Sequence, residues 1–128
     1  MNITRSIDVE DVIRAALAPH MAAYCRPLPA AFSLPSVLVT QVGGTDEEGA
    51  IDIVDVVLDA RAKTSAEANE TLRNAVAIMR QAAKEQTTAI RHLEVNSSGS
   101  WGADPVRPDL AMYSARLRVW AHLEQITI

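Results

Sequence analysis

Three aspartates in the stretch from residue 50 to 62 are the first candidates for chemistry in this sequence: Asp52, Asp55 and Asp59. In an extended strand, Asp55 and Asp59 lie on one face with Val57 between them. Two carboxylates on one face can perform acid–base chemistry or hold a divalent cation. The alternative interpretation is the polar side of a half-covered sheet or the lining of a contact between subunits, which the polar–apolar alternation favours.

The other reactive residue types lack the spacing that chemistry needs. The three histidines, His20, His92 and His122, and the single cysteine, Cys25, form no metal-ligand pattern. Gly43-Gly44 has neither spacing of a phosphate-binding loop and is typical of a hairpin turn. We therefore expect no catalytic residue, no cofactor site and no metal site, and predict that the protein is not an enzyme.

Several charged and aromatic residues instead have the types that protein contacts favour. Arg116 and Arg118 share a strand face with Trp120, and Arg and Trp are enriched at the centres of interfaces. The alternative is that the two arginines only keep an outward face soluble. A turn and a loop add further candidates, so the predicted contact residues are Asp46, Glu47, Glu48, Asp55, Asp59, Trp101, Arg107, Arg116, Arg118 and Trp120.

Four segments should position these residues. Apolar spacing predicts an N-terminal helix over residues 7–24, kinked at Pro19. Residues 36–62 alternate as two strands around Gly43-Gly44 and predict a hairpin. A capping box, Thr64 followed by Glu67, opens a long helix over residues 64–87. Residues 89–125 predict a second hairpin with a long loop at 97–109.

The order of these segments predicts an α+β fold. The long helix connects the two hairpins as a crossover, so the strands on either side of it should run parallel. We expect a mixed four-stranded sheet with the long helix on one face, together with the N-terminal helix. Residues 1–128 then form a single α/β domain, as a length of 128 residues favours.

Composition excludes some classes of protein. Hydrophobic residues make up 48% of the chain and charged residues 22%, which is typical of a globular fold rather than a disordered one. A net charge of −4 argues against nucleic-acid binding. No apolar run is long enough for a membrane span, and the first residues lack the pattern of a signal peptide.

The order of elements also resembles a known family. An N-terminal helix precedes the strand Leu34-Pro35-Ser36-Val37-Leu38-Val39, and the next strand ends Val57-Leu58-Asp59-Ala60-Arg61-Ala62. A helix opening Thr64-Ser65-Ala66-Glu67-Ala68, a loop ending Pro105-Val106-Arg107-Pro108 and the strand Ala115-Arg116-Leu117-Arg118-Val119-Trp120 follow. In this order, over residues 7–123, the chain resembles the tail terminator (tail completion) proteins of long-tailed bacteriophages.

The resemblance implies a structural protein without catalysis or cofactor. Such proteins form a ring, usually a hexamer, at the head-proximal end of the tail tube, where they end polymerisation and join the tail to the head. The implied partners are other copies of the chain, the tail tube protein and the head connector or neck protein, with DNA only passing through the ring. The implied location is the virion tail, with assembly in the cytoplasm of the bacterial host.

Three other hypotheses remain open at this point. A head–tail connector or neck protein would differ only in its partner. A small α/β enzyme would use Asp55, Asp59 and His92, and requires a pocket in which polar groups converge. A ferredoxin-like ligand-binding module would require two βαβ units, whereas the sequence predicts one crossover helix.

Overall fold

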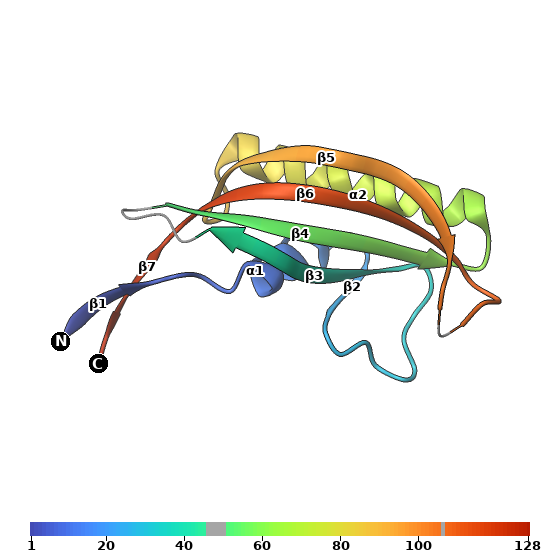
Figure 1. Cartoon of the computed structure of the whole chain (residues 1–128), viewed down its shortest axis with the longest axis horizontal. Coiled ribbons are helices and arrows are strands. Elements are labelled where there is room, and N and C mark those ends of the chain that lie inside the picture. The colour runs from blue at the N-terminus through green and yellow to red at the C-terminus, as the bar shows by residue number, and fades with distance from the viewer. Residues whose placement is uncertain (46–50, 106) are drawn as a thin grey trace.

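The computed structural model describes residues 1–45, 51–105 and 107–128, and it is α+β (Figure 1). The order of elements is β1 (Asn2–Arg5), α1 (Val9–Leu17), β2 (Ala22–Cys25), β3 (Ser36–Thr45), β4 (Ile51–Ala62), α2 (Ser65–Glu85), β5 (Ile90–Ala103), β6 (Ala111–His122) and β7 (Glu124–Thr127). No helix in these ranges has the length and apolar character to cross a bilayer.

The main sheet is mixed and has five strands in the order β2-β3-β4-β6-β5. The pair β2–β3 is parallel, and the other neighbouring pairs are antiparallel. Because β4 and β5 are both antiparallel to β6, the two strands that flank α2 run parallel to each other, as predicted, with β6 inserted between them. The prediction of four strands is wrong, because β2 adds a fifth.

A second, two-stranded sheet pairs the two ends of the described chain. Here β1 is antiparallel to β7, with Ile3 opposite Ile126 and Arg5 opposite Glu124. We call this sheet the terminal ribbon. The sequence predicted one last strand over residues 110–125, but β6 ends at His122 and β7 pairs with β1 instead.

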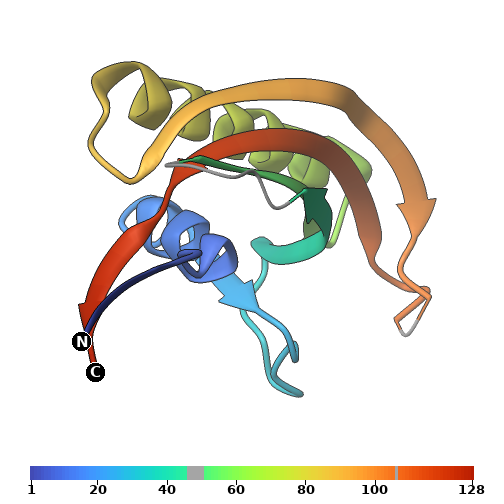
Figure 2. The same ribbon diagram turned by 60° about the vertical axis from the view of Figure 1, so that its left-hand side comes forward.

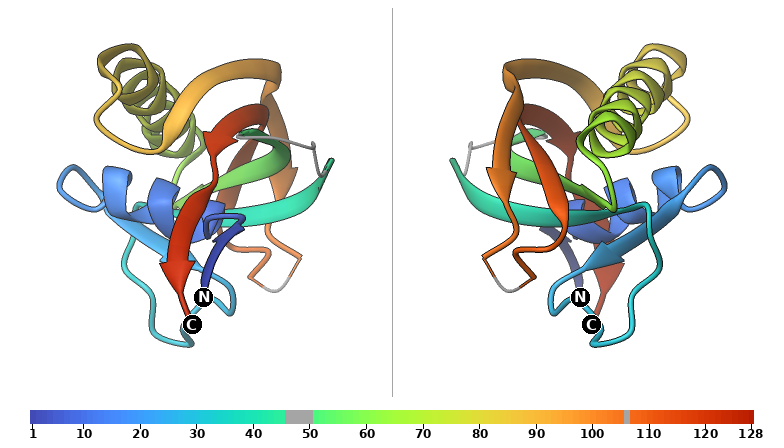
Figure 3. Two further views of the ribbon diagram at one scale, coloured as in Figure 1. Left: turned by 90° about the vertical axis from the view of Figure 1, so that its left-hand side faces the viewer. Right: turned by 90° about the vertical axis from the view of Figure 1, so that its right-hand side faces the viewer.

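Both helices cover the same face of the main sheet (Figure 3). On α1 the buried residues are Val9, Ile13 and Leu17, whereas α2 buries a stripe that includes Leu72 and Met79. These side chains pack on the buried residues of the strands, namely Val37, Val39, Val54, Val56, Leu58, Ala60, Ile90, Leu93, Ala115, Leu117, Val119 and Ala121. The apolar face predicted for β4 and β6 is therefore the core face.

The long helix begins where the capping box predicted. The Thr64 hydroxyl oxygen accepts a hydrogen bond from the Glu67 N–H at 3.2 Å. At the other end, Gln86 adopts a left-handed backbone (φ 54°), and its N–H donates to the carbonyls of the last turn. The helix is thus terminated locally, without proline.

The N-terminal helix is shorter than predicted. It ends at Leu17, and residues 22–25 form strand β2, so the prediction of a helix through residue 24 is wrong. The apolar residues after Pro19 fit a strand as well as a further helical turn, since four residues are too few to separate the two periods.

The prediction of a loop over residues 97–109 is also wrong over most of its length. Strand β5 continues to Ala103, with register shifts between Ile90 and His92, between Val95 and Ser97 and between Ser97 and Ser100. Such bulges accommodate glycine and bend the strand, and Figure 2 shows β5 and β6 curving strongly together.

Candidate partner-binding surfaces

The face of the main sheet that points away from the helices carries five of the seven predicted contact residues that the structure describes. Strands β4 and β6 place their alternate residues there, and these side chains are half-buried or exposed except for Arg61. We call this surface the open face. Its members on these two strands are Ile53, Asp55, Val57, Asp59, Arg61, Met112, Ser114, Arg116, Arg118 and Trp120.

An ion pair crosses the middle of the open face. Asp55 lies directly opposite Arg118, and its Oδ1 and Oδ2 accept from Arg118 Nε and Nη2 at 3.0 and 3.5 Å. The hydrogen bond to Asp55 and its charge raise the pKa of Arg118. The pair is solvent-exposed, with 47% of the Arg118 side chain accessible, so it contributes little to stability in the isolated chain.

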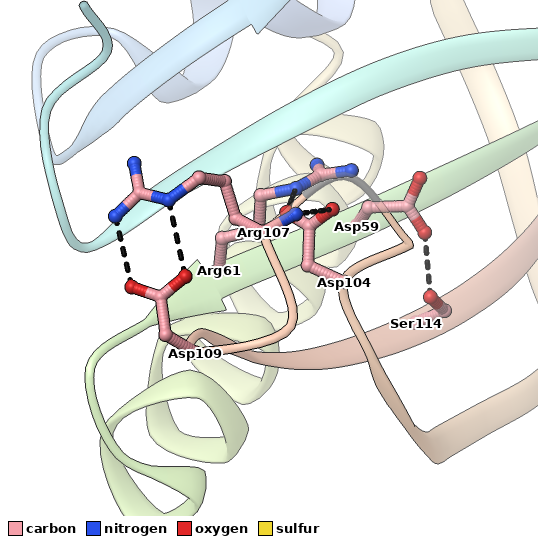
Figure 4. Close-up of polar contacts among 6 residues, drawn as sticks. All are labelled: Asp59, Arg61, Asp104, Arg107, Asp109 and Ser114. Carbon is pink, nitrogen blue, oxygen red and sulfur yellow. Dashed lines mark hydrogen bonds and ion pairs between the residues drawn. The ribbon is translucent and has the colours of Figure 1, made fainter.

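Asp59 lies on the same face, as predicted, but has its own partner. Its Oδ1 accepts from the Ser114 hydroxyl at 2.5 Å, shown at the right of Figure 4. Asp55 and Asp59 are four residues apart along β4, which separates their backbones by about 13 Å. They are too far apart to share one cation or one proton.

The arginine and tryptophan stripe predicted on β6 lies on the open face. Arg116 is exposed and makes no ion pair with the residues that the structure describes. Trp120 is half-buried and tilts against His92 on β5, with the ring centroids 4.9 Å apart and the planes at 54°. An unpaired cation and an aromatic ring thus lie on one accessible strand.

The remaining predicted contact residues lie elsewhere. Trp101 is in strand β5, not in a loop; it is 62% exposed, and its Nε1 donates to Ser65 Oγ at 3.3 Å. Arg107 makes a bidentate pair with Asp109 at 3.1 and 2.9 Å, which raises the pKa of Arg107 and lowers that of Asp109. Asp46, Glu47 and Glu48 lie outside the described residues.

A groove of 500 Å³ occupies one end of the open face. We call it the linker groove, because residues 28–32 of the segment between β2 and β3 form one wall. Its lining is mostly apolar and consists of Leu28, Pro29, Ala30, Phe32, Leu38, Arg61, Asp104 and Arg107. In the linker, the Ser33 N–H donates to the Tyr24 hydroxyl at 3.0 Å, which ties this wall back to β2.

Arg61 and Asp104 form a buried ion pair beside this groove (Figure 4). Arg61 Nε donates to Asp104 Oδ2 at 2.7 Å, and the two side chains are only 9% and 3% exposed. Asp104 Oδ1 also accepts from the Arg107 N–H at 3.3 Å. Arg61 Nη1 is buried and has no hydrogen-bond partner among the residues that the structure describes.

Sequence reasoning did not identify this pair. The alternation that places Asp55 and Asp59 on the outward face of β4 also places Arg61 there, but the linker and the segment after β5 bury it. The partners are 43 residues apart in the chain, so no local spacing could have indicated them.

The comparisons with known proteins are negative. A scan of protein-family models gives no match to this sequence, and a search of curated proteins gives none either. A function for this chain is therefore inferred from the surfaces described above and from the resemblance in element order.

Proposed function

We propose that this protein is a ring-forming tail terminator of a long-tailed bacteriophage. In this role, copies of the chain, with a hexamer as the expected number, assemble at the head-proximal end of the tail tube and end its polymerisation. The ring then joins the tail to the head through the tube protein on one side and the connector or neck protein on the other. It functions in the virion tail after assembly in the host cytoplasm, without cofactor, catalysis or binding of nucleic acid.

One observation carries the proposal: the main sheet is covered by helices on one face only. The open face mixes apolar side chains, such as Val57 and Trp120, with the guanidinium of Arg116, which has no ion-pair partner in the described part of the chain. In addition, β2 and β5 are the two edge strands, and each edge presents unpaired backbone groups to a neighbouring chain. Closed symmetric assembly covers such surfaces on every subunit at once.

The arrangement of Asp55, Asp59 and His92 favours this proposal over the enzyme hypothesis. Each has a different neighbour: Arg118 for Asp55, Ser114 for Asp59, and the Trp120 ring for His92. Their side chains do not converge on one another, whereas acid–base catalysis requires groups within hydrogen-bond reach of the same substrate atoms.

The proposal is tested by size-exclusion chromatography with light scattering, combined with negative-stain electron microscopy. We expect a ring with a central hole, or a monomer that becomes a ring on purified tail tubes. A protein that stays monomeric at all concentrations and does not bind tail tubes would contradict the proposal.

A matched pair of charge reversals locates the contact. Arg116→Glu places a negative charge in the open face and should weaken ring assembly or tube binding. Arg73→Glu makes the same change on the exposed side of α2 and should have no effect. Equal behaviour of both variants would show that the open face is not a contact surface.

A further inference from the structure

Half of the basic side chains make no ion pair with the residues that the structure describes. The chain has twelve Lys and Arg residues, and six arginines pair with an aspartate or a glutamate. The basic residues without an ion pair in this part of the chain are Lys63, Arg73, Arg80, Lys84, Arg91 and Arg116. Four of these six gather between α2 and β5.

Two adjoining hollows between α2 and β5 collect these four cations. One, of 180 Å³, is lined by Arg80, Lys84, Arg91 and His92 beside the buried Leu93. The other, of 230 Å³, is lined by Arg73 and Arg80 beside Val76 and Val95. We call the two hollows together the basic groove. Its cations are exposed, and no aspartate or glutamate within the described ranges lines it.

The helix dipole accounts for only one of the four cations. Partial negative charge at the carboxyl end of a helix stabilises basic residues in the last turn. Lys84 lies in that turn of α2, whereas Arg73 and Arg80 lie before it and Arg91 is on β5. The groove therefore carries a surplus of positive charge on a chain whose net charge is −4, and a ligand of opposite charge would neutralise it.

The spacing of the cations on α2 matches that of an extended peptide. Arg73, Arg80 and Lys84 are seven and four residues apart, so they lie on one side of the helix. Cβ atoms four residues apart on a helix are separated by about 5–6 Å. In an extended chain, alternate side chains lie on one side about 6.6 Å apart. Acidic residues at alternate positions can therefore face Arg80 and Lys84 together.

The lining of the groove favours a polypeptide over a nucleic acid. Proteins hold single-stranded nucleic acid by stacking its bases on aromatic rings, but no Phe, Tyr or Trp lines the groove in the ranges that the structure describes. Duplex binding requires a broad basic surface, whereas these cations form a narrow row on an acidic protein. Carboxylates on an extended polypeptide need only such a row.

We propose that the basic groove binds an acidic, extended segment of a partner protein. Carboxylates at alternate positions of the segment pair with Arg80 and Lys84, and Arg91 adds a third positive charge beside them. The exposed side of α2 does not belong to the open face, so the groove stays accessible when neighbouring copies cover that face. The partner is a protein other than the neighbouring copy, and its binding does not require ring assembly.

Fluorescence anisotropy with a labelled peptide of about four Glu-Ala repeats tests the proposal on the full chain. We expect binding that weakens as sodium chloride is raised, because salt screens exposed charges. A Gln-Ala peptide of the same length should not bind. A peptide with the same composition but with its glutamates in one block should bind at least about threefold more weakly. Equal affinity for the two acidic peptides would overturn the extended arrangement.

Charge substitutions locate the binding site. Arg80→Glu should weaken peptide binding by at least about tenfold, because Arg80 lines both hollows. Lys84→Gln, which removes a charge without reversing it, should weaken binding about two- to fivefold. Lys63→Glu is the matched control: Lys63 is exposed and lies outside the groove, so its reversal should change the affinity by less than about twofold. Equal losses for Lys63→Glu and Arg80→Glu would overturn the site.

The remaining outcomes separate this contact from the proposed ring. Ring assembly and tube binding should be unchanged in Arg80→Glu. Their loss would make the groove a contact of the ring itself, which overturns the separate partner and leaves the ring intact. An oligothymidylate of about ten nucleotides should bind more weakly than the acidic peptide, and tighter binding would overturn the polypeptide ligand. Absence of peptide binding overturns the proposal whether or not rings form.

Discussion

Replacing Asp104 by asparagine is expected to destabilise the fold strongly. The substitution keeps the shape of the side chain but removes the charge that neutralises Arg61, which is 9% exposed and has no other ion pair shown. An asparagine oxygen can face either Arg61 Nε or the Arg107 N–H, whereas the aspartate accepts from both. One hydrogen bond and the whole charge compensation are lost together.

The magnitude follows from the burial of the pair. Breaking a buried ion pair by removing one partner costs about 3–5 kcal/mol, because the remaining charge stays desolvated. The shift in melting temperature is this free-energy loss divided by the entropy of unfolding. At about 2.1 cal/mol/K per residue, the unfolding entropy of a chain of 128 residues is about 0.27 kcal/mol/K. The melting temperature should therefore fall by about 11–19 °C.

Thermal and urea unfolding followed by circular dichroism measure this loss. Asp109→Asn is the control: Asp109 pairs with Arg107 in an exposed position, so this substitution should leave the melting temperature nearly unchanged. The double replacement Arg61→Met with Asp104→Leu should regain most of the stability, because no charge is left buried. A loss below about 1 kcal/mol for Asp104→Asn would show that Arg61 finds another partner or water, and the reasoning would fail.

Three further predictions concern Leu72 in the core, Glu10 in α1 and Cys25 in β2. Leu72→Ala should cost about 2–5 kcal/mol in urea unfolding, because Leu72 is fully buried between α2 and the sheet; a cost below 1 kcal/mol would contradict this packing. Burial alone would raise the pKa of Glu10, but hydrogen bonds from the Gln41 N–H and Arg26 lower it below 4.5. The ionised Glu10 side chain therefore stabilises the folded state fully above about pH 4.5, and this contribution is lost as the pH falls through the folded-state pKa. Glu10→Gln should flatten the acid side of the curve of unfolding free energy against pH. An unchanged curve would refute this role of Glu10. Burial, and to a smaller extent the charge of Glu10, raise the pKa of the Cys25 thiol. Iodoacetamide at pH 8 should therefore label Cys25 more slowly in the folded chain than in urea. Equal labelling rates would contradict the raised pKa.

The elements that the sequence predicted correctly are those with long, regular periods. Burial alternates in strand β4 from Ile51 to Ala60, and α2 carries an apolar stripe over about six turns, so each period is repeated often enough to be unambiguous. The capping box at Thr64 then defined the helix start within one residue. The crossover rule gave the relative direction of β4 and β5 without any long-range information.

The elements that the sequence missed are short or depend on distant partners. Strands β1, β2 and β7 have four residues each, and their pairing joins segments that local patterns do not relate. The same limit applies to the candidate surfaces. Asp55, Asp59, Arg116 and Trp120 share the open face because alternation dictates it, whereas the burial of Arg61 depends on the linker and on Asp104.

The contrast between Arg61 and Arg118 indicates how a partner would act on the open face. Both arginines are on this face and each pairs with an aspartate at 2.7–3.0 Å. At Arg61 the linker already covers the sheet, so the ion pair with Asp104 is buried, and removing Asp104 strongly destabilises the fold. At Arg118 the face is bare, so Asp55→Asn should cost less than about 1 kcal/mol in the isolated chain. If a neighbouring subunit covers the middle of the open face, Asp55→Asn leaves Arg118 buried without its counter-charge, and it should weaken assembly far more than it destabilises the monomer.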